Sequence, residues 1–92
     1  MRYCVKLTKE AKEGIKFFKK AGERQVLNKI ELLLEELELQ PRKGEGKPKR
    51  IPFRGKKYWR RKITDKHRLI YDIKDNIVTV TVIKVGDHYD DK

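Results

Sequence analysis

Cysteine is almost absent from this sequence of 92 residues, because Cys4 is the only one. A single cysteine cannot form a disulfide within the chain, and such sparing use is typical of proteins in a reducing compartment. Cys4 falls among the alternating apolar residues of a predicted first strand. We therefore expect a buried, unreactive thiol rather than a nucleophile.

Long apolar stretches are also missing. The longest aliphatic run covers only residues 32–34, and the first twenty residues contain no apolar core of a signal peptide. A membrane-spanning helix needs about 20 predominantly apolar residues. We therefore expect no such helix and no secretory signal, which together with the lone cysteine predicts a cytoplasmic protein.

Few residues are suited to binding a metal or a cofactor. His67 and His88 are far apart, the cysteine is distant from both, and Asp90 with Asp91 makes a weak pair of ligands. The glycines of residues 44–47 lack the spacing of a phosphate-binding loop. We therefore expect neither a metal nor a cofactor.

Positive charge, by contrast, is abundant and concentrated in one segment. The net charge is +11, and residues 41–68 hold thirteen Lys or Arg but only two acids, Glu45 and Asp65, which accounts for the whole surplus. Such self-repulsion lowers stability unless a polyanion compensates it. Nucleic acid is the first candidate. A merely solvated basic loop is the second, and a membrane surface is the third because no basic amphipathic helix is present.

The hydrophobic pattern predicts a single domain over residues 1–92 with the order β-α-α-β-β-β-β. Period-two and helical patterns place strands at residues 2–7, 49–53, 58–63, 67–74 and 77–85, and helices from the cap Thr8 to residue 20 and over residues 23–38. The fold class is α+β. Two N-terminal helices should pack as an antiparallel pair on one face of a four- to five-stranded, mainly antiparallel sheet.

The turn between the last two strands sets their register. A two-residue turn that pairs Lys74 with Ile77 places Arg68 opposite Ile83. The final strand then ends near Arg68, so the C-terminal tail, residues 86–92, should leave the sheet beside this arginine.

A tight turn after the preceding strand places Lys62 directly opposite Arg68. The helix-covered face then consists of Trp59, Ile63, Leu69, Tyr71, Ile73, Val78, Val80 and Val82. The open face consists of Tyr58, Arg60, Lys62, Arg68, Asp72, Thr79 and Thr81. Like charges directly opposite destabilise a sheet, so the basic cluster predicts an anion there, whereas side chains that splay into solvent would need none.

A basic face of this kind suits metal-free cleavage of RNA, which carries its own nucleophile, the 2′-hydroxyl. The reaction needs a base, cations beside the phosphate and an acid for the leaving 5′-oxygen. Arg68 and Lys62 can supply the cations, His88 the acid, and Tyr89 a stacking or proton-donating group. Further RNA contacts are expected from Lys47, Arg50, Arg54, Tyr58, Arg60 and Arg61. These residues alone leave plain RNA binding open.

Four motifs follow one another in the second half of the chain. They are Gly46-Lys47-Pro48, Tyr58-Trp59-Arg60-Arg61-Lys62-Ile63-Thr64, His67-Arg68-Leu69-Ile70-Tyr71 and Gly86-Asp87-His88-Tyr89. Their order and spacing closely resemble the Txe/YoeB toxins of the RelE superfamily over residues 44–89. Residues 1–43 match only as a strand and two helices.

The resemblance implies a RelE-like fold and a ribosome-dependent mRNA interferase from a bacterial toxin–antitoxin pair. Such an enzyme cuts mRNA in the ribosomal A site by 2′-hydroxyl attack without a metal. Arg68 would stabilise the transition-state phosphate, His88 would be the general acid and Tyr89 would help to place the substrate. The implied partners are mRNA, the ribosome and a cognate antitoxin of the YefM or Phd type that covers or distorts the site.

Two positions depart from the family pattern. Lys49 stands where the typical member has Glu, the proposed general base, and Lys62 stands where Arg is common, which loses bidentate geometry. Lys49 could act as the base if crowded positive charge lowered its pKa, and Glu45 is a nearby alternative. Two other functions therefore stay open: a non-catalytic RNA- or ribosome-binding protein on the same scaffold, and a ParE-like toxin that binds gyrase.

Overall fold

The computed structural model describes residues 2–87, with the backbone alone for Asp87. In that part of the chain the elements are β1 (Cys4–Leu7), α1 (Lys9–Lys20), α2 (Arg24–Leu39), β2 (Lys49–Phe53), β3 (Lys56–Lys62), β4 (His67–Lys74), the 3-10 turn η1 (Asp75–Ile77) and β5 (Thr79–Asp87). The predicted order is confirmed, and β2 and β4 have the predicted bounds.

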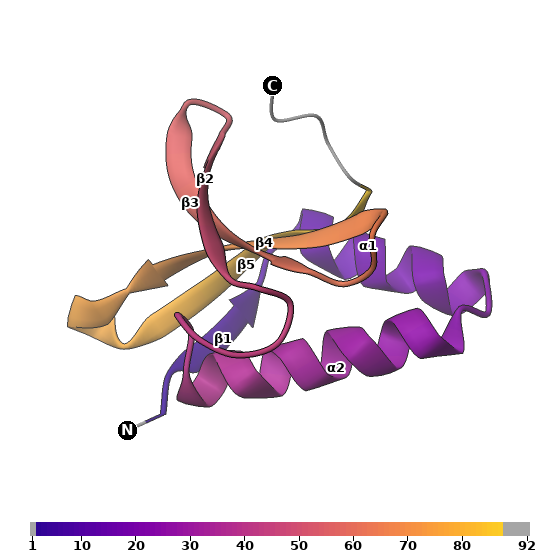
Figure 1. Cartoon of the computed structure of the whole chain (residues 1–92), viewed down its shortest axis with the longest axis horizontal. Coiled ribbons are helices and arrows are strands. Elements are labelled where there is room, and N and C mark those ends of the chain that lie inside the picture. The colour runs from indigo at the N-terminus through magenta and orange to yellow at the C-terminus, as the bar shows by residue number, and fades with distance from the viewer. Residues whose placement is uncertain (1, 88–92) are drawn as a thin grey trace.

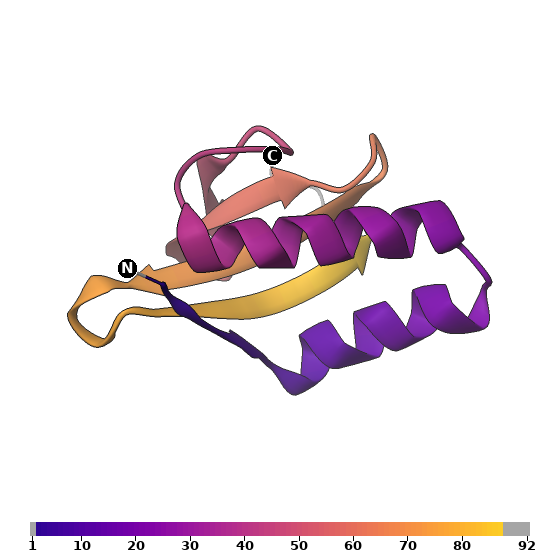
Figure 2. The same cartoon turned by 90° about the horizontal axis from the view of Figure 1, so that it is seen from below.

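The strands form one sheet in the order β1-β5-β4-β3-β2, in which β1 runs parallel to β5 and the other neighbours are antiparallel. Both helices cover the same face of this sheet and run antiparallel to each other, while the β2–β3 hairpin rises from the rest (Figures 1 and 2). The predicted α+β fold class is therefore confirmed.

The helix pair is held at its beginning by the predicted cap. The hydroxyl of Thr8 accepts a hydrogen bond from the backbone N–H of Ala11 at 3.1 Å and donates one to the carbonyl of Ile83 in β5 at 2.7 Å. The first bond satisfies an otherwise unpaired helix N–H. The second joins the start of α1 to the sheet, so one side chain fixes both the helix end and its position.

The main core lies between the helix pair and the sheet. Its buried residues are Ala11, Phe18, Val26, Ile30, Leu33, Leu37, Ile63, Leu69, Tyr71, Val80, Val82 and Val85. Seven of the eight residues expected on the helix-covered face line or border this core, and Val78 is the exception because it lies in the turn before β5. The apolar side of α2, with Ile30, Leu33 and Leu37, is thus a packing surface.

The opposite face is less polar than predicted. Ile70 is fully buried there, because Ile51 and Phe53 of the β2–β3 hairpin fold over it, with Tyr58 and Ile83 packed alongside. Only the part of this face that the hairpin does not cover therefore stays basic and open to solvent. The prediction missed the second cluster because it treated the hairpin as a flat continuation of the sheet.

The predicted register of the last hairpin is wrong at its turn. Lys74 pairs with Thr79 rather than with Ile77. The connection is longer because Asp75–Ile77 forms a 3-10 turn and Val78 adopts a left-handed conformation with φ of 47°.

A β-bulge shifts the same hairpin further. The register changes between Ile70 and Tyr71, so Arg68 pairs with Gly86 and not with Ile83. The extra residue lengthens β5 and bends it. The final strand was predicted to end near Arg68, and this holds for the described residues, because the end of β5 lies beside Arg68.

The thiol of Cys4 is exposed, which corrects the expectation of a buried one. β1 is an edge strand whose Val5 and Leu7 pack on the core, so Cys4 and Lys6 lie on the uncovered side. Among residues 2–87, no helix is long and apolar enough to cross a membrane.

Candidate active site

The candidate site is built on a row of residues that crosses three strands. Lys62 of β3 pairs with Arg68 of β4, as predicted, and Arg68 pairs with Gly86 of β5. The next residue, Asp87, ends the described part of the chain. The predicted acid His88 and its neighbour Tyr89 follow it in sequence and lie outside the described residues.

The guanidinium of Arg68 is held by the turn between β3 and β4. Its Nη1 donates hydrogen bonds to the carbonyls of Thr64 at 2.8 Å, Asp65 at 3.0 Å and His67 at 3.2 Å. Within residues 2–86, whose side chains the structure describes, no acceptor bonds its Nε or Nη2 and no carboxylate pairs with it. An arginine has five N–H donors, so the turn fixes this group while leaving donors for an anion.

Lys62 is more loosely held than Arg68. Its Nζ lies 3.8 Å from the carboxylate of Asp65, and its side chain is 35% exposed. An ion pair this long and this exposed contributes little to stability. The ammonium group is therefore free to turn toward a phosphate at the Lys62–Arg68 pair.

The connector, residues 40–48, lies against the same end of β3. The backbone N–H of Lys62 donates to the carbonyl of Gly46 at 2.7 Å, and Nη1 of Arg60 donates to the carbonyl of Lys47 at 3.1 Å. Between the connector and the β3–β4 turn is a pocket of about 460 Å³, whose wall includes Lys47, Lys62 and Glu45. These contacts bring a second basic segment beside Lys62.

Both candidate bases lie on this side of the molecule. Lys49 is exposed and pairs with Arg60, so strand alternation puts it on the same face as Lys62. The carboxylate of Glu45 lines the pocket and lies 3.5 Å from Nζ of Lys29 on α2, a residue that the sequence did not single out. The geometry therefore keeps both Lys49 and Glu45 as candidates.

The other predicted RNA contacts are not gathered at this row. Arg50 lies on the opposite face, with its guanidinium 5.7 Å from the Trp59 ring centroid. Tyr58 packs against Phe53 with ring centroids 5.9 Å apart. Both positions follow from alternation along the curled β2–β3 hairpin.

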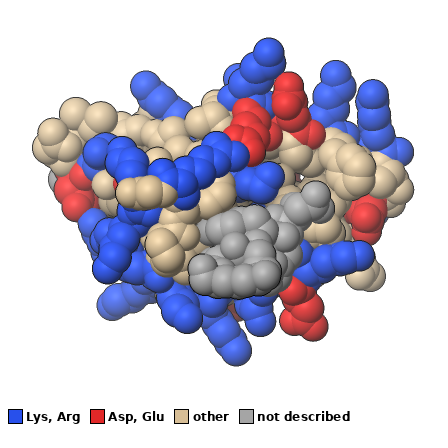
Figure 3. All heavy atoms as spheres, turned by 90° about the horizontal axis from the view of Figure 1, so that it is seen from above, with Lys and Arg blue, Asp and Glu red and all other residues tan. Residues whose placement is uncertain are grey.

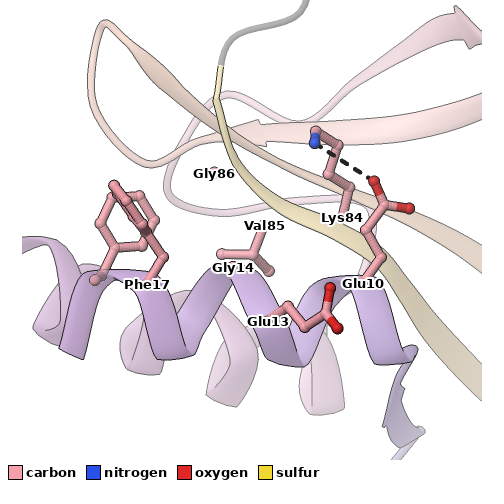
Figure 4. A pocket seen from close by; sticks show the side chains of 8 residues that line it. Glu10, Glu13, Gly14, Phe17, Lys84, Val85 and Gly86 are labelled. Atoms are coloured by element: carbon pink, nitrogen blue, oxygen red, sulfur yellow. Dashed lines mark hydrogen bonds and ion pairs between the residues drawn. The ribbon is translucent and has the colours of Figure 1, made fainter. Parts of the chain in front are cut away.

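Arg54, at the tip of the hairpin, pairs with Glu10 of α1 at 2.8 Å. The hydrogen bond from Arg54 lowers the pKa of Glu10, and Lys84 adds a second cation at 3.5 Å (Figure 4). Since Glu10 already neutralises part of this charge, Arg54 is less available to RNA than the sequence implied.

Arg61 is the clearest correction among the predicted RNA contacts, because its side chain is fully buried. It points from β3 into the helix-covered side, where it forms an ion pair with Glu36 at 2.7 Å and further hydrogen bonds to the connector. A side chain without exposed surface cannot contact RNA in this structure.

The face seen from above Figure 1, from which the β2–β3 hairpin rises, is rich in Lys and Arg side chains (Figure 3). Among residues 2–86, no cluster of His, Cys, Asp or Glu could hold a metal ion. The site that the described residues form is a pair of cations, Lys62 and Arg68, beside a pocket, suited to stabilising a phosphate.

Comparison with known proteins places the chain in a family. Residues 7–89 match the YoeB-like toxins of bacterial type II toxin–antitoxin systems. The chain belongs to this family. A toxin named YoeB from Mycobacterium bovis is 36% identical over 69 residues, which covers 75% of this chain and 79% of that protein. The resemblance found in the sequence motifs is therefore confirmed.

Solved structures agree with this family assignment. The YoeB/ParE toxin from Agrobacterium tumefaciens superposes with a TM-score of 0.83 at 26% identity, over 94% of this chain and 99% of that one. The toxin of the YoeB–YefM heterotetramer from Staphylococcus aureus gives a TM-score of 0.76 at 27% identity, over 97% and 100%. This YoeB-family toxin therefore shares the whole fold of its relatives.

Proposed function

We propose that this toxin is a ribosome-dependent endoribonuclease that cuts mRNA in the ribosomal A site. The observation that carries the proposal is the pairing of Lys62 with Arg68 on the open face, where two like charges lie directly opposite each other. Such a pair is unfavourable unless an anion lies between its members. A scissile phosphate is the anion that fits a toxin of this family.

In the proposed reaction the ribose 2′-oxygen attacks the adjacent phosphorus while a base removes the hydroxyl proton. The bond from phosphorus to the 5′-oxygen then breaks, and His88 donates a proton to that oxygen, which leaves a 2′,3′-cyclic phosphate and a 5′-hydroxyl. Arg68 and Lys62 stabilise the extra negative charge of the transition state. Tyr89 helps to place the substrate.

The ribosome supplies what this small chain does not. A protein of 92 residues has little surface with which to shape an extended RNA, whereas the A site holds a codon in a fixed conformation. Orientation of this kind lowers a barrier by several kcal/mol, of order 7 or more in favourable cases. Because the substrate is on translating ribosomes, we place the toxin in the cytoplasm.

A cognate antitoxin is the second proposed partner. The Staphylococcus aureus relative is described as a complex of YoeB with YefM. We infer that an antitoxin of this kind binds the present toxin and covers or distorts the row of Lys62 and Arg68.

Primer extension on a translating mRNA tests the nuclease, with wild type, Arg68→Ala and His88→Ala side by side. We expect cuts at A-site codons that fall by roughly a hundredfold or more in both variants. Arg24→Ala is the matched control, because Arg24 is exposed at the start of α2 and belongs to none of the three strands of the row. Lys49→Gln and Glu45→Gln in the same assay identify the base.

One observation favours a second function, which is ribosome binding without cleavage. Lys49 occupies the place of the acid that the family uses as its base. If wild type makes no cuts, while all variants still bind ribosomes in a salt-sensitive way, the protein is a binder on a nuclease scaffold and the proposed catalysis is wrong.

A further inference from the structure

The buried guanidinium of Arg61 has a partner for every one of its donors. Nε donates to the hydroxyl of Tyr71 at 3.3 Å, and Nη1 donates to the carboxylate of Glu36 at 2.7 Å. The remaining bonds go from Nη1 to the carbonyl of Glu45 at 3.3 Å, and from Nη2 to the carbonyls of Gln40 and Lys43, both at 2.6 Å. Five acceptors therefore match the five N–H groups of arginine.

Three of these acceptors are backbone carbonyls of one segment, the connector. A buried carbonyl without a hydrogen-bond donor is costly. The N–H groups of Arg61 therefore set the position of the connector. Tyr71 reinforces the arrangement, because its hydroxyl accepts from Arg61 and donates to the carbonyl of Pro41 at 2.6 Å. The connector is thus wrapped around one side chain of β3.

The end of the connector reaches the candidate site directly after this network. Gly46 approaches β3 so closely that a Cβ on it would lie 2.7 Å from the carbonyl oxygen of Lys62, and its φ is +81°. The same stretch carries Glu45 and Lys47 into the pocket beside Lys62. The position of one pocket wall therefore depends on a residue that is itself out of reach of any substrate.

We propose that Arg61 is a positioning residue for cleavage, which acts by fixing the connector so that Glu45 and Lys47 line the pocket beside Lys62. This inference rests on the proposed nuclease function. Arg61 does not touch RNA, so its loss should displace the pocket wall, and with it Lys47, without removing a phosphate contact of its own.

The test compares Arg61→Lys and Arg61→Met with wild type in two measurements. In amide hydrogen exchange, we expect residues 40–47 to lose protection in both variants while β4 and β5 keep theirs. In single-turnover cleavage of ribosome-bound mRNA, we expect the rate to fall by roughly tenfold to a hundredfold, as for a small misplacement of reacting groups. The salt slope of ribosome binding should fall by no more than the one contact that Lys47 of the connector makes, since Arg61 itself contacts no phosphate.

Two further variants separate positioning from general loss of stability. Val80→Ala removes buried volume from the core of β5 without touching the connector, and it should slow cleavage far less than Arg61→Met at equal thermal stability. Gly46→Ala leaves Arg61 intact but should push the connector away from Lys62. We therefore expect it to slow cleavage as the Arg61 variants do. Should Arg61→Met not fold, Arg61→Lys and Gly46→Ala decide the question.

The outcomes distinguish this inference from the function on which it rests. If wild type cleaves and the Arg61 variants cleave no more slowly than Val80→Ala, the positioning role is wrong. A salt slope that fell by more than the one contact of Lys47 in the Arg61 variants would also overturn it, because that result means direct RNA contact by Arg61. If wild type does not cleave at all, the proposed function fails. Loss of amide protection at residues 40–47 in the Arg61 variants then still supports the claim that Arg61 fixes the connector, and unchanged protection overturns that claim.

Discussion

The carboxylate of Glu36 is the charged partner of a fully buried arginine, which makes its removal costly. Glu36→Ala leaves the guanidinium of Arg61 buried without its counter-charge, and breaking such a pair costs about 3 kcal/mol or more. We expect the free energy of unfolding to fall by about 3 kcal/mol in urea titrations. Glu35→Ala is the control, because Glu35 is exposed on the same helix, and it should change stability by less than about 0.5 kcal/mol. Equal effects would contradict the ion-pair argument.

Asp75 links three segments at the far end of the sheet. It accepts two hydrogen bonds from Arg42 of the connector, the shorter at 2.7 Å, and one from the hydroxyl of Tyr3 at 2.7 Å. The hydrogen bond with Arg42, followed by that with Tyr3, lowers the pKa of Asp75. A lowered folded-state pKa stabilises the fold above the ordinary carboxyl pKa, and this contribution disappears as the pH falls through the lowered value.

This pH dependence can be measured with Asp75→Asn. We expect the wild type to be more stable than the variant by a constant amount from pH 5 to pH 7, and the difference to shrink as the pH falls below about 4, the usual carboxyl range. Denaturant midpoints over pH 2–7 provide the measurement. A difference that stayed constant down to pH 2 would mean that the charge of Asp75 contributes nothing.

For single residues, strand alternation in the sequence predicts which charged side chains lie opposite each other, but it does not predict which of them are buried. The pairing of Lys62 with Arg68 follows from a tight turn and period-two alternation, and both were correct. The burial of Arg61 depends on carbonyls up to 21 positions away along the chain, which no local pattern reveals. Its one available signal was its place on β3, since it alternates with Arg60 and Lys62 and therefore has to face the helices.

Among the secondary-structure elements, α1 and β5 lie in close contact at Gly14. A Cβ at this position would lie 1.9 Å from the carbonyl oxygen of Val85, so the helix can lie this close only because the side chain is absent (Figure 4). Phe18 of the same helix is 1% exposed and packs beside this contact. The spacing between the helix layer and the sheet therefore depends on one glycine.

Gly14→Ala tests this packing. Alanine favours a helix by about 1 kcal/mol over glycine, but overpacking at a fixed contact costs typically 1–3 kcal/mol, and here the clash is with backbone. We expect a net loss of about 2 kcal/mol in the free energy of unfolding. Lys16→Ala, at an exposed position of α1, should change it by less than about 0.5 kcal/mol. A stabilised Gly14→Ala variant would show that the helix can move outward at no cost.

Element bounds were predictable where the chain carries local signals. Thr8 caps α1 as expected, and the turn residues around β2 and β4 gave correct bounds. The β4–β5 register was not predictable, because a left-handed valine and a β-bulge are set by packing rather than by residue type. The curl of the β2–β3 hairpin over Ile70 also depends on contacts between distant residues, so the second cluster had no local signal.

In the whole molecule, the excess positive charge lies in one part of the structure, and the rest is nearly neutral. The surplus of +11 comes from residues 41–68, which form the connector, β2, β3 and the start of β4, while the remaining residues carry equal numbers of each sign. The helices and β1 thus form a nearly neutral support for a strongly basic sheet edge. An arrangement of this kind attracts a polyanion to one side and orients it there.

The salt dependence of ribosome binding measures this attraction. Each phosphate contact adds about 0.7–0.9 to the slope of log affinity against log salt. We therefore expect Lys47→Gln to lower the slope by about one contact, on ribosomes whose A-site codon carries 2′-O-methyl riboses and cannot be cut by 2′-hydroxyl attack. Lys12→Gln, on the exposed side of α1, should leave the slope unchanged. If both substitutions lowered it equally, the toxin would bind through its overall charge, and the basic edge of the sheet would not be the surface that faces RNA.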